Sequence, residues 1–332
     1  MNQPRYDVLA IGNAIVDVIA DATDKFLEEQ GLDKGSMRLI DEEEATRLYG
    51  LMNPGRELSG GSAGNTAAGL AALGVKTAFI GQVANDQLGT IYRHDIEAAG
   101  VDFLAPPRDD VGATARCLVL VTPDAQRTMN TFLGAANQLP PEAIDPSAIA
   151  DAAILYLEGY LWDLPGPKAA MEKAIDAARD AGRKVAFTLS DSFCIARHRD
   201  DFLRLIDEGK IDILFSNEKE IVELSGEGDI DDAAAKIAPK VPLLIVTRSE
   251  KGAIAIEDGH RARVGAEPIR ELVDTTGAGD LFASGFLAGM ARGLDLEASL
   301  RLGAIAAAEV IQHYGARPEE DLKALASHIL EA

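Results

Sequence analysis

The residues best suited to do chemistry lie in the segment DTTGAGD, at positions 274–280. Gly277 and Gly279 allow a tight turn that gathers backbone N–H groups, and such groups at the start of a helix form an anion-binding hole. Asp280 falls in the first turn of a helix predicted to begin near residue 278, where its carboxylate can accept a proton from a hydroxyl. An anion hole beside a base is what phosphoryl transfer to an alcohol requires. A simple helix cap is the alternative, but the complete string between a strand and a helix favours the catalytic site.

A second glycine-rich segment, GGSAGN, occupies positions 60–65. Its close glycines admit a ligand against the backbone, and Asn65 offers a donor and an acceptor to sugar hydroxyls. Residues 60–64 also match G-x-S-x-G, the nucleophile elbow of α/β-hydrolases, with Ser62 as the nucleophile. That elbow must directly follow a buried strand, and residues 54–59 do not have a strand pattern. We therefore favour a substrate-binding loop over a hydrolase, and a flexible loop with a helix cap is the structural alternative.

Two further polar segments follow predicted strands. Asn13 and Asp17 come just after the apolar run at residues 8–11, where ligands of open α/β sheets bind, and they could hold vicinal hydroxyls. Asn217 and Glu220 follow the strand at 211–215 and share one face of a helix, where they could hold hydrated Mg²⁺. A polar turn explains the first pair, and a capped helix with a solvated face explains the second equally well.

Composition excludes several classes of protein. The 332 residues carry 32 Lys and Arg against 54 Asp and Glu, a net charge of −22, which disfavours nucleic-acid and anionic-membrane partners. The two cysteines build no disulfide scaffold, and the five histidines lack metal-ligand spacing. We expect a cytoplasmic protein, since we identify no signal peptide and no apolar run of about 18 residues. The sequence also contains no P-loop and no G-x-G-x-x-G after the first strand.

The elements that must position these residues are short apolar strands alternating with helices. This rhythm predicts an α/β fold with a mostly parallel central sheet covered by helices on both faces. Residues 15–40 and 108–132 depart from it, because they are rich in strands without crossover helices. We therefore expect a large α/β domain at 1–14, 41–107 and 133–332, with 15–40 and 108–132 forming a small β-sheet lid.

The two glycine-rich segments, in this order and with NEKE at 217–220 between them, resemble the signatures of the ribokinase/PfkB carbohydrate kinases. The resemblance covers nearly the whole chain. The spacing of Asn13 and Asp17, together with YLEGY at 156–160 and TLSDSF at 188–193, is most similar to the adenosine kinase branch. It implies a ribokinase-like three-layer α/β/α domain with a β lid, and transfer of the γ-phosphoryl group of ATP, with Mg²⁺, to the 5′-hydroxyl of adenosine.

Three alternatives stay open beside adenosine. One is a sugar kinase of the same fold, acting on ribose or fructose, and another is a kinase for inosine or guanosine. A non-catalytic nucleoside-binding protein is the third, which Asp280 and both glycines of its segment disfavour. As for assembly, the resemblance is compatible with a monomer or with a homodimer formed through the lid.

The resemblance also implies roles for individual residues. Asp280 would be the catalytic base, with Gly277, Ala278 and Gly279 as the anion hole. Arg127, on the hairpin of the lid, would approach the transferred phosphoryl group. The substrate-binding residues would be Asn13, Asp17, Gly61, Ser62 and Asn65 around the sugar, and Cys117, Met129, Tyr160 and Phe193 around the purine.

The cofactors would have their own residues. Thr247 and Gly252, with Gly277 and Gly279, would bind ATP, while Asn217 and Glu220 would act through Mg²⁺ and water. A monovalent-cation loop for K⁺ would comprise Asp274, Thr276, Val310 and Gly315. The sequence departs from the family pattern at Ser249, where glycine is usual, and at Glu319, where a small hydroxyl residue is usual.

Overall fold

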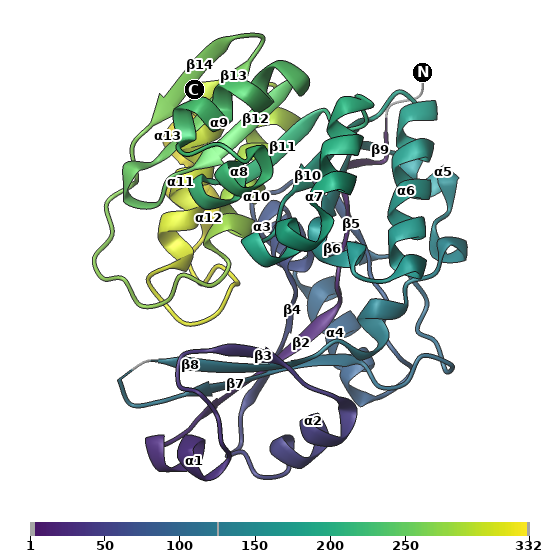
Figure 1. Cartoon of the computed structure of the whole chain (residues 1–332), viewed down its shortest axis with the longest axis vertical. Helices are drawn as coiled ribbons and strands as arrows, with labels where there is room; N and C mark the ends of the chain where they lie inside the picture. The colour runs from purple at the N-terminus through teal and green to yellow at the C-terminus, as the bar shows by residue number, and fades with distance from the viewer. Residues whose placement is uncertain (1–3, 125, 331–332) are drawn as a thin grey trace.

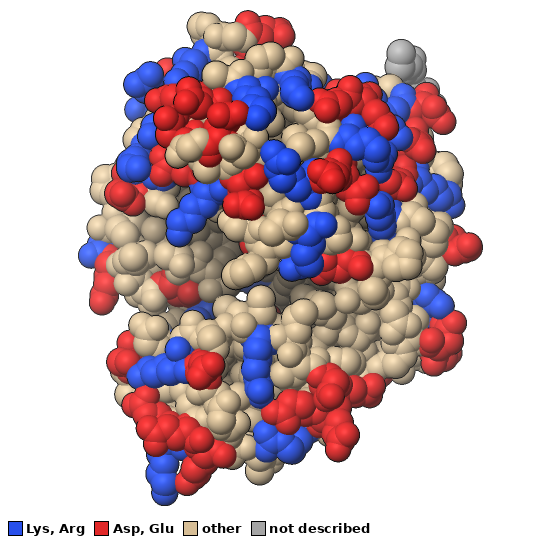
Figure 2. Space-filling model, viewed as in Figure 1, with Lys and Arg blue, Asp and Glu red and all other residues tan. Residues whose placement is uncertain are grey.

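Two β-sheets organise the chain (Figure 1). The space-filling view shows a cleft between the upper and lower parts of the molecule (Figure 2). The structure is a computed structural model, which describes residues 4–124 and 126–330. The larger sheet has nine strands in the order β14-β13-β12-β11-β10-β9-β1-β5-β6. Neighbours pair in parallel from β12 to β6, and β13 and β14 continue the sheet as antiparallel strands. The bounds are β1 (Tyr6–Ile11), β5 (Thr77–Ile80), β6 (Val101–Phe103), β9 (Ala152–Glu158), β10 (Lys184–Thr188), β11 (Ile213–Asn217), β12 (Leu243–Thr247), β13 (Ala253–Glu257) and β14 (His260–Val264).

Helices cover both faces of this sheet, which confirms the expected three-layer α/β/α fold. The inner strands are nearly continuous apolar runs because both of their faces are buried. One face packs against α3 (Ser62–Ala72), α10 (Ala278–Ala291) and α11 (Leu296–Val310). The other packs against α5 (Pro146–Ala150), α6 (Pro165–Asp180), α7 (Ser192–Asp207), α8 (Glu218–Ser225) and α9 (Ile230–Ile237). The large domain also contains α4 (Gln87–Ala98), beside β6, and the C-terminal α12 (Leu322–Leu325) and α13 (Ser327–Leu330).

The smaller sheet forms the predicted lid, in the order β3-β8-β7-β2-β4. Its strands are β2 (Ile15–Asp21), β3 (Met37–Leu39), β4 (Arg56–Gly60), β7 (Ala115–Val121) and β8 (Arg127–Phe132), with α1 (Asp24–Glu29) and α2 (Glu42–Tyr49). The hairpin expected in the lid is present as the antiparallel pair β7–β8.

Residues 41–60 lie with this lid, whereas the sequence placed them in the large domain. Helix α2 contacts β7 and β8, and β4 pairs antiparallel with β2. The sequence of β4, RELSG, has no strand signature, because an edge strand of a small sheet can form from backbone pairing with few apolar residues. Two of the connections between the large domain and the lid are short: residues 12–14, between β1 and β2, and residues 60–62, between β4 and α3. We call them the first and the second linker.

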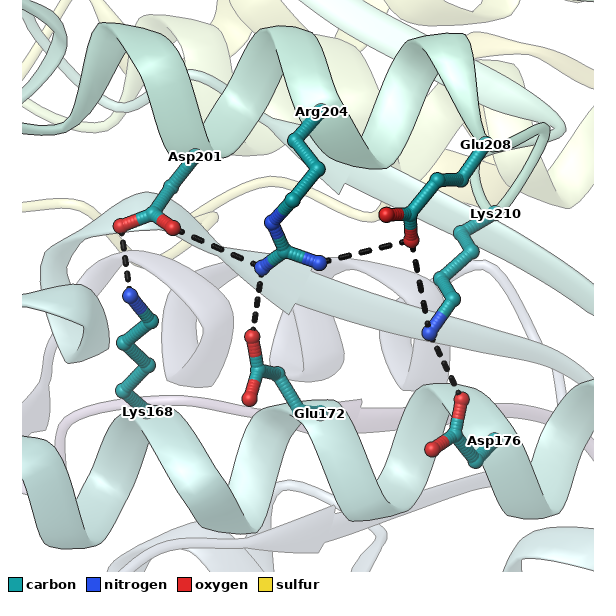
Figure 3. A network of polar contacts seen from close by, with 7 residues as sticks. All are labelled: Lys168, Glu172, Asp176, Asp201, Arg204, Glu208 and Lys210. Carbon is teal, nitrogen blue, oxygen red and sulfur yellow. Dashed lines mark hydrogen bonds and ion pairs between the residues drawn. The ribbon is translucent and has the colours of Figure 1, made fainter.

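A network of ion pairs joins α6 to α7 and to Lys210, which follows α7 (Figure 3). The pairs are Lys168–Asp201 (2.6 Å), Arg204–Glu172 (2.6 Å) and Lys210–Asp176 (3.0 Å). Single surface pairs contribute little, about 0–1 kcal/mol, but a network across two helices resists their sliding. It holds the part of α7 that follows a break in helical geometry at residue 198. The shorter first part of α7, which faces the cleft, lies outside this network.

None of the helices in the described part of the chain is long and apolar enough to cross a lipid bilayer.

Candidate active site

The centre of the site lies where α3 and α10 begin side by side. Asp280, in the first turn of α10, accepts a hydrogen bond from Ser62 Oγ at 2.6 Å and another from Asn65 Nδ2 at 3.0 Å. The two helices approach closely because Gly69 has no side chain where Ser284 packs against it. Ser284 also donates to the carbonyl of Thr66 at 2.9 Å. The two glycine-rich motifs therefore meet at Asp280.

The carboxylate of Asp280 sits in an environment that disfavours its charge. Burial raises its pKa to about 6, although the hydrogen bonds from Ser62 and Asn65 and the charge of Arg317 act to lower it. The group is therefore ionised at neutral pH, yet it is a stronger base than an exposed aspartate. This is the protonation behaviour that a base acting on an alcohol needs.

The glycines around Asp280 leave space for a ligand against the backbone. Gly277 has φ = +77°, a conformation that favours glycine, and it packs on Ala316 so closely that a Cβ would not fit. Beside Gly279, a Cβ would meet no heavy atom of the described residues within 4 Å. The N-terminus of a 14-residue helix thus opens onto free space, where an anion can approach the backbone N–H groups.

Arg127 reaches from β8 of the lid to the start of this motif. Its Nη1 lies 2.7 Å from Oδ2 of Asp274, in a pair whose side chains are only 10% and 7% exposed. Its guanidinium also lies over the ring of Tyr314, at 5.1 Å from the centroid. Among residues 4–124 and 126–330, its Nε and Nη2 are buried with no hydrogen-bond partner. Two donors are therefore left for an anion beside Gly277–Gly279.

A cavity of about 410 Å³ extends from Ser62 along the cleft. It is lined by Asn13, Ile15, Met37, Leu39, Ser62, Thr131, Leu133, Glu158, Tyr160, Asp163, Asp191, Phe193 and Arg197. Four of the predicted substrate-binding residues are among them: Asn13, Ser62, Tyr160 and Phe193. Aromatic and aliphatic side chains from both domains therefore face one space that is large enough for a nucleoside.

The structure does not place Cys117 and Met129 in the lining of this cavity. Both lie on the same face of the lid sheet as Arg127 and Thr131, because side chains alternate along a strand. Cys117 is covered by its neighbours, with Thr131 Oγ1 donating to its Sγ at 3.3 Å, and burial raises its pKa to about 12. Met37 and Leu39 of the edge strand β3 supply the apolar lid surface instead, and the sequence analysis did not assign them a role.

Two buried amide oxygens near this centre are free to accept a hydrogen bond from a ligand. Asn13 Oδ1 and Asn65 Oδ1 have no hydrogen-bond partner within the part of the chain that the structure describes. Unpartnered buried acceptors are costly, and a hydroxyl donor would satisfy each of them. Asn65 already donates to Asp280, so a hydroxyl on its oxygen would lie next to the base.

Asp17 lies on β2 and faces the cleft, with Gly60 and Cys117 as its neighbours. Burial raises its pKa to about 6, while the charges of Arg317 and Arg127 lower it. Gly61 has φ = +84° and packs against the carbonyl of Asn13, so the two linkers touch each other. Asp17 and Gly61 thus surround the cavity end at Ser62, although neither is among the lining residues.

Sequence reasoning missed two charged residues at this centre. Glu158, at the end of β9, is fully buried and accepts hydrogen bonds from the backbone N–H groups of Asn13 (2.8 Å) and Ala63 (2.7 Å). Burial raises its pKa to about 7. Arg317 follows α11 and donates to the carbonyls of Ser59 and Gly64. The position of Glu158 at a strand end was a usable signal, whereas nothing in the local sequence around Arg317 marks it.

A strand, β4, does precede Ser62, although residues 54–59 have no strand pattern. It is a partly exposed edge strand of the lid and not the buried strand that a nucleophile elbow requires. The geometry also disfavours a nucleophile elbow, because Ser62 Oγ donates to Asp280. No histidine is hydrogen-bonded to Ser62 among the described residues.

A comparison with protein families decides the assignment. The model of the pfkB family carbohydrate kinases matches residues 37–322. The chain belongs to the PfkB family. It is accordingly a phosphotransferase with an alcohol acceptor.

Individual relatives of this PfkB kinase agree over almost its full length. A structure described as adenosine kinase from Sinorhizobium meliloti is 48% identical, with a TM-score of 0.90, and the match covers 98% of this chain and 99% of that one. A probable sugar kinase from Rhizobium etli is also 48% identical, with a TM-score of 0.91 and the same coverage. Adenosine kinase of Saccharomyces cerevisiae is 27% identical over 93% of this chain and 95% of its own length.

The expected magnesium pair of the PfkB kinase forms a helix cap. Asn217 Oδ1 accepts from the backbone N–H of Glu220 at 2.9 Å, and Glu220 Oε2 accepts from that of Asn217 at 3.0 Å. Glu220 is 6% exposed, and burial, together with the charges of Asp191 and Asp280, raises its pKa to about 7. The cap expected in the structural alternative is present, but Glu220 is buried and does not lie on a solvated face. A role of the pair toward Mg²⁺ through water stays a prediction.

The other predicted nucleotide residues of the kinase gather at the same edge of the sheet. Thr247 pairs in register with Asn217, because the parallel strands β11 and β12 end together. Gly252 closes the following turn with φ = +84°. Ser249, where the family usually has glycine, adopts φ = +50°, which explains why glycine suits this position.

Three residues of the expected cation loop lie together. Asp274 Oδ1 accepts from Thr276 Oγ1 at 2.8 Å, and its Oδ2 accepts from the backbone N–H of Gly315 at 3.2 Å. Val310 is fully buried at the end of α11. Within the described ranges, no group of three or more His, Cys, Asp or Glu residues is arranged to hold a metal ion. Binding of K⁺ at this loop stays a prediction.

Proposed function

We propose that this PfkB kinase transfers the γ-phosphoryl group of ATP to the 5′-hydroxyl of a nucleoside, most specifically of adenosine, to give AMP and ADP. The observation that carries the proposal is that Ser62, bonded to the base Asp280, and the aromatic pair Tyr160 and Phe193 line one cavity. The flat purine ring of a nucleoside needs such an apolar face, whereas a free sugar does not. The relatives described as adenosine kinases support the same substrate.

The chemistry follows from the positions of the side chains. The nucleoside hydroxyl attacks the γ-phosphorus as Asp280 accepts its proton, and the bond from that phosphorus to the bridging oxygen breaks to release ADP. The backbone N–H groups at Gly277–Gly279 and the two free donors of Arg127 balance the charge on the phosphoryl oxygens. Arg127 belongs to the lid, so this stabilisation is available only when the lid is closed, which also excludes water.

ATP and Mg²⁺ fit the residues at the carboxyl edge of the large sheet. The open backbone beside Gly279 leaves room for phosphates, and Thr247 and Gly252 border the same edge. Bound Mg²⁺ would neutralise charge on the phosphates. Asn217 and Glu220 would hold it through water, because their own hydrogen bonds keep both side chains in the cap. Asp274, Thr276, Val310 and Gly315 would supply the site for K⁺.

Location and assembly are part of the same proposal. Both cysteines of the described chain are free and buried, which fits the reducing cytoplasm. The protein works as a monomer or as a homodimer through the lid. In the homodimer, the edge strands β3 and β4 of the lid would offer their backbone groups for pairing with a second copy.

The test is a coupled assay of ADP release with Mg²⁺, comparing adenosine, inosine, guanosine, ribose and fructose at equal concentration. We expect strong turnover with adenosine alone. Turnover with inosine or guanosine would support the nucleoside site but would change the purine that we assign to it. Turnover with a free sugar would keep Asp280 and its anion hole but remove the role of Tyr160 and Phe193, in line with the probable sugar kinase among the relatives.

A further inference from the structure

Arg317 lies in the loop between α11 and α12, and its guanidinium spans the second linker. Nε and Nη2 donate to the carbonyl of Ser59 at 3.0 and 2.8 Å, and Nη2 also donates to Ser59 Oγ at 2.8 Å. Nη1 donates to the carbonyl of Gly64 at 2.7 Å. Ser59 belongs to β4 of the lid, and Gly64 belongs to the first turn of α3 in the large domain. One rigid, planar group therefore forms hydrogen bonds with backbone carbonyls on both sides of the linker.

The residues held in this way lead directly to the base. Ser62 and Asn65, the two donors to Asp280, lie between or next to the two gripped carbonyls. The N-cap of α3 is Gly61, which provides no side chain to fix the first turn. The position of this turn must therefore come from tertiary contacts. Arg317 supplies one of them through Nη1 at Gly64, while its Nε and Nη2 hold Ser59 just before the linker.

Carboxylates surround this guanidinium without contacting it. Its charge faces Asp17, Asp95 and Asp280, together with the hydroxyl of Tyr92. Asp95 is linked to it through Ser59, whose N–H and Oγ both donate to Asp95 Oδ2. Across residues 4–124 and 126–330, Arg317 forms no ion pair within 4 Å with any of the three. A positive charge near these carboxylates, even without direct contact, favours the ionised form of both Asp17 and Asp280.

The same loop also reaches the lid arginine. Gly315, two residues before Arg317, donates to Asp274, whose carboxylate pairs with Arg127. The loop thus contacts the second linker at one end and the partner of the lid arginine at the other.

We propose that Arg317 is a positioning residue of the kinase, which holds the second linker at one length and supplies the positive charge that faces both Asp17 and Asp280. Its two tasks have different chemical requirements. Gripping two carbonyls at once needs the fork of a guanidinium, whereas facing the carboxylates needs only a positive charge. Substitution by lysine and by methionine therefore separates them.

The first arm of the test measures amide hydrogen exchange of residues 56–66 in the free protein, and it does not depend on the proposed function. We expect Arg317→Met and Arg317→Lys both to accelerate exchange there, by about tenfold or more, since each loses the fork. Arg292→Met is the matched control, because Arg292 also donates to backbone carbonyls, of Leu73 and Ala288, but lies at the other end of α10. Wild-type exchange in Arg317→Lys would overturn the role of the fork, even if Arg317→Met fails to fold.

The second arm measures the pH profile of kcat/KM for the phosphoryl acceptor, and it rests on the proposed function. In Arg317→Met we expect the acid limb to move to higher pH by roughly 0.5 unit or more, because a carboxylate that loses a nearby positive charge binds its proton more tightly. Arg317→Lys and Arg292→Met should keep the wild-type limb. An unmoved limb in Arg317→Met would overturn the electrostatic role. If the wild-type protein phosphorylates no acceptor, the proposed function fails, while the exchange arm still decides the role of the linker.

Discussion

Ser62 Oγ lies 2.6 Å from Oδ1 of Asp280, although 218 positions separate the two residues in the sequence. This hydrogen bond joins the two glycine-rich motifs into one site. It also places a donor on a carboxylate oxygen of the proposed base, so Ser62 lowers the pKa that burial has raised. The basicity of Asp280 is thus the result of two opposed effects that come from different helices.

Replacing the base tests the chemistry most directly. Asp280→Asn keeps the size of the side chain but cannot accept a proton, so we expect kcat to fall by about 10²–10⁴. The measurement is steady-state turnover of adenosine with Mg²⁺ and ATP. Asp295→Asn is the control, because Asp295 caps α11 far from the cavity and asparagine caps a helix equally well. Near-normal turnover in Asp280→Asn would remove Asp280 from the mechanism.

The pH profile of the wild-type kinase should report the same carboxylate. The pKa of Asp280 in the free protein is about 6, so kcat/KM should be flat above pH 7 and decline below pH 6. Ser62→Ala removes a hydrogen bond that lowers this pKa, so its acid limb should lie at higher pH than that of the wild type. An acid limb that Ser62→Ala leaves in place would contradict the role assigned to this hydrogen bond.

The same raised pKa predicts that the site costs stability at neutral pH. The folded-state pKa of about 6 lies above the unfolded value of about 3.9, so the folded protein binds the proton more tightly. The free energy of unfolding should therefore decrease as pH rises from about 4 to 6, and the loss should persist above 6. Asp280→Asn removes the ionisable group and with it this loss of stability. We expect the free energy of unfolding of the variant to exceed that of the wild type by roughly 1–3 kcal/mol at pH 8, and the difference to disappear near pH 4.

Thermal unfolding at both pH values is the measurement for this gain. Asp295→Asn serves again as the control and should show no increase in Tm at pH 8. If Asp280→Asn is less stable than the wild type at pH 8, the prediction fails. The hydrogen bonds to the carboxylate would then stabilise its charge by more than burial destabilises it.

Tyr160 should make the cavity selective for a nucleoside over a free sugar. Tyr160 is packed along the cavity, and its hydroxyl donates to the carbonyl of Ser190 at 3.4 Å. Tyr160→Ala removes the apolar face for the base, so kcat/KM for adenosine should decrease by about tenfold or more, with most of the change in KM. Activity on ribose, measured at high concentration, should change little. Equal losses on both acceptors would place Tyr160 outside the base site, and Tyr49→Ala on the outer lid is the control for a lost tyrosine.

Local sequence patterns were sufficient for the α/β framework. Short apolar strands alternate with helices over most of the chain, and the strands predicted at 8–11 and 211–215 are present as β1 and β11. The lid hairpin β7–β8 was also predictable, because two strand patterns flank a Pro-Asp turn. Strand β4 was not, because an edge strand of a small sheet depends on pairing with β2 rather than on its own residues.

The sequence by itself determined the type of chemistry, because a base beside an anion hole can be built from seven neighbouring residues. Only the tertiary structure decided which residues surround that base. Glu158 and Arg317 act on atoms of residues that are far away in the sequence, through the ends of β9 and α11. Such contacts depend on the order of strands in the sheet and on the close packing of α3 against α10 at Gly69, and no local pattern of residues encodes either of them.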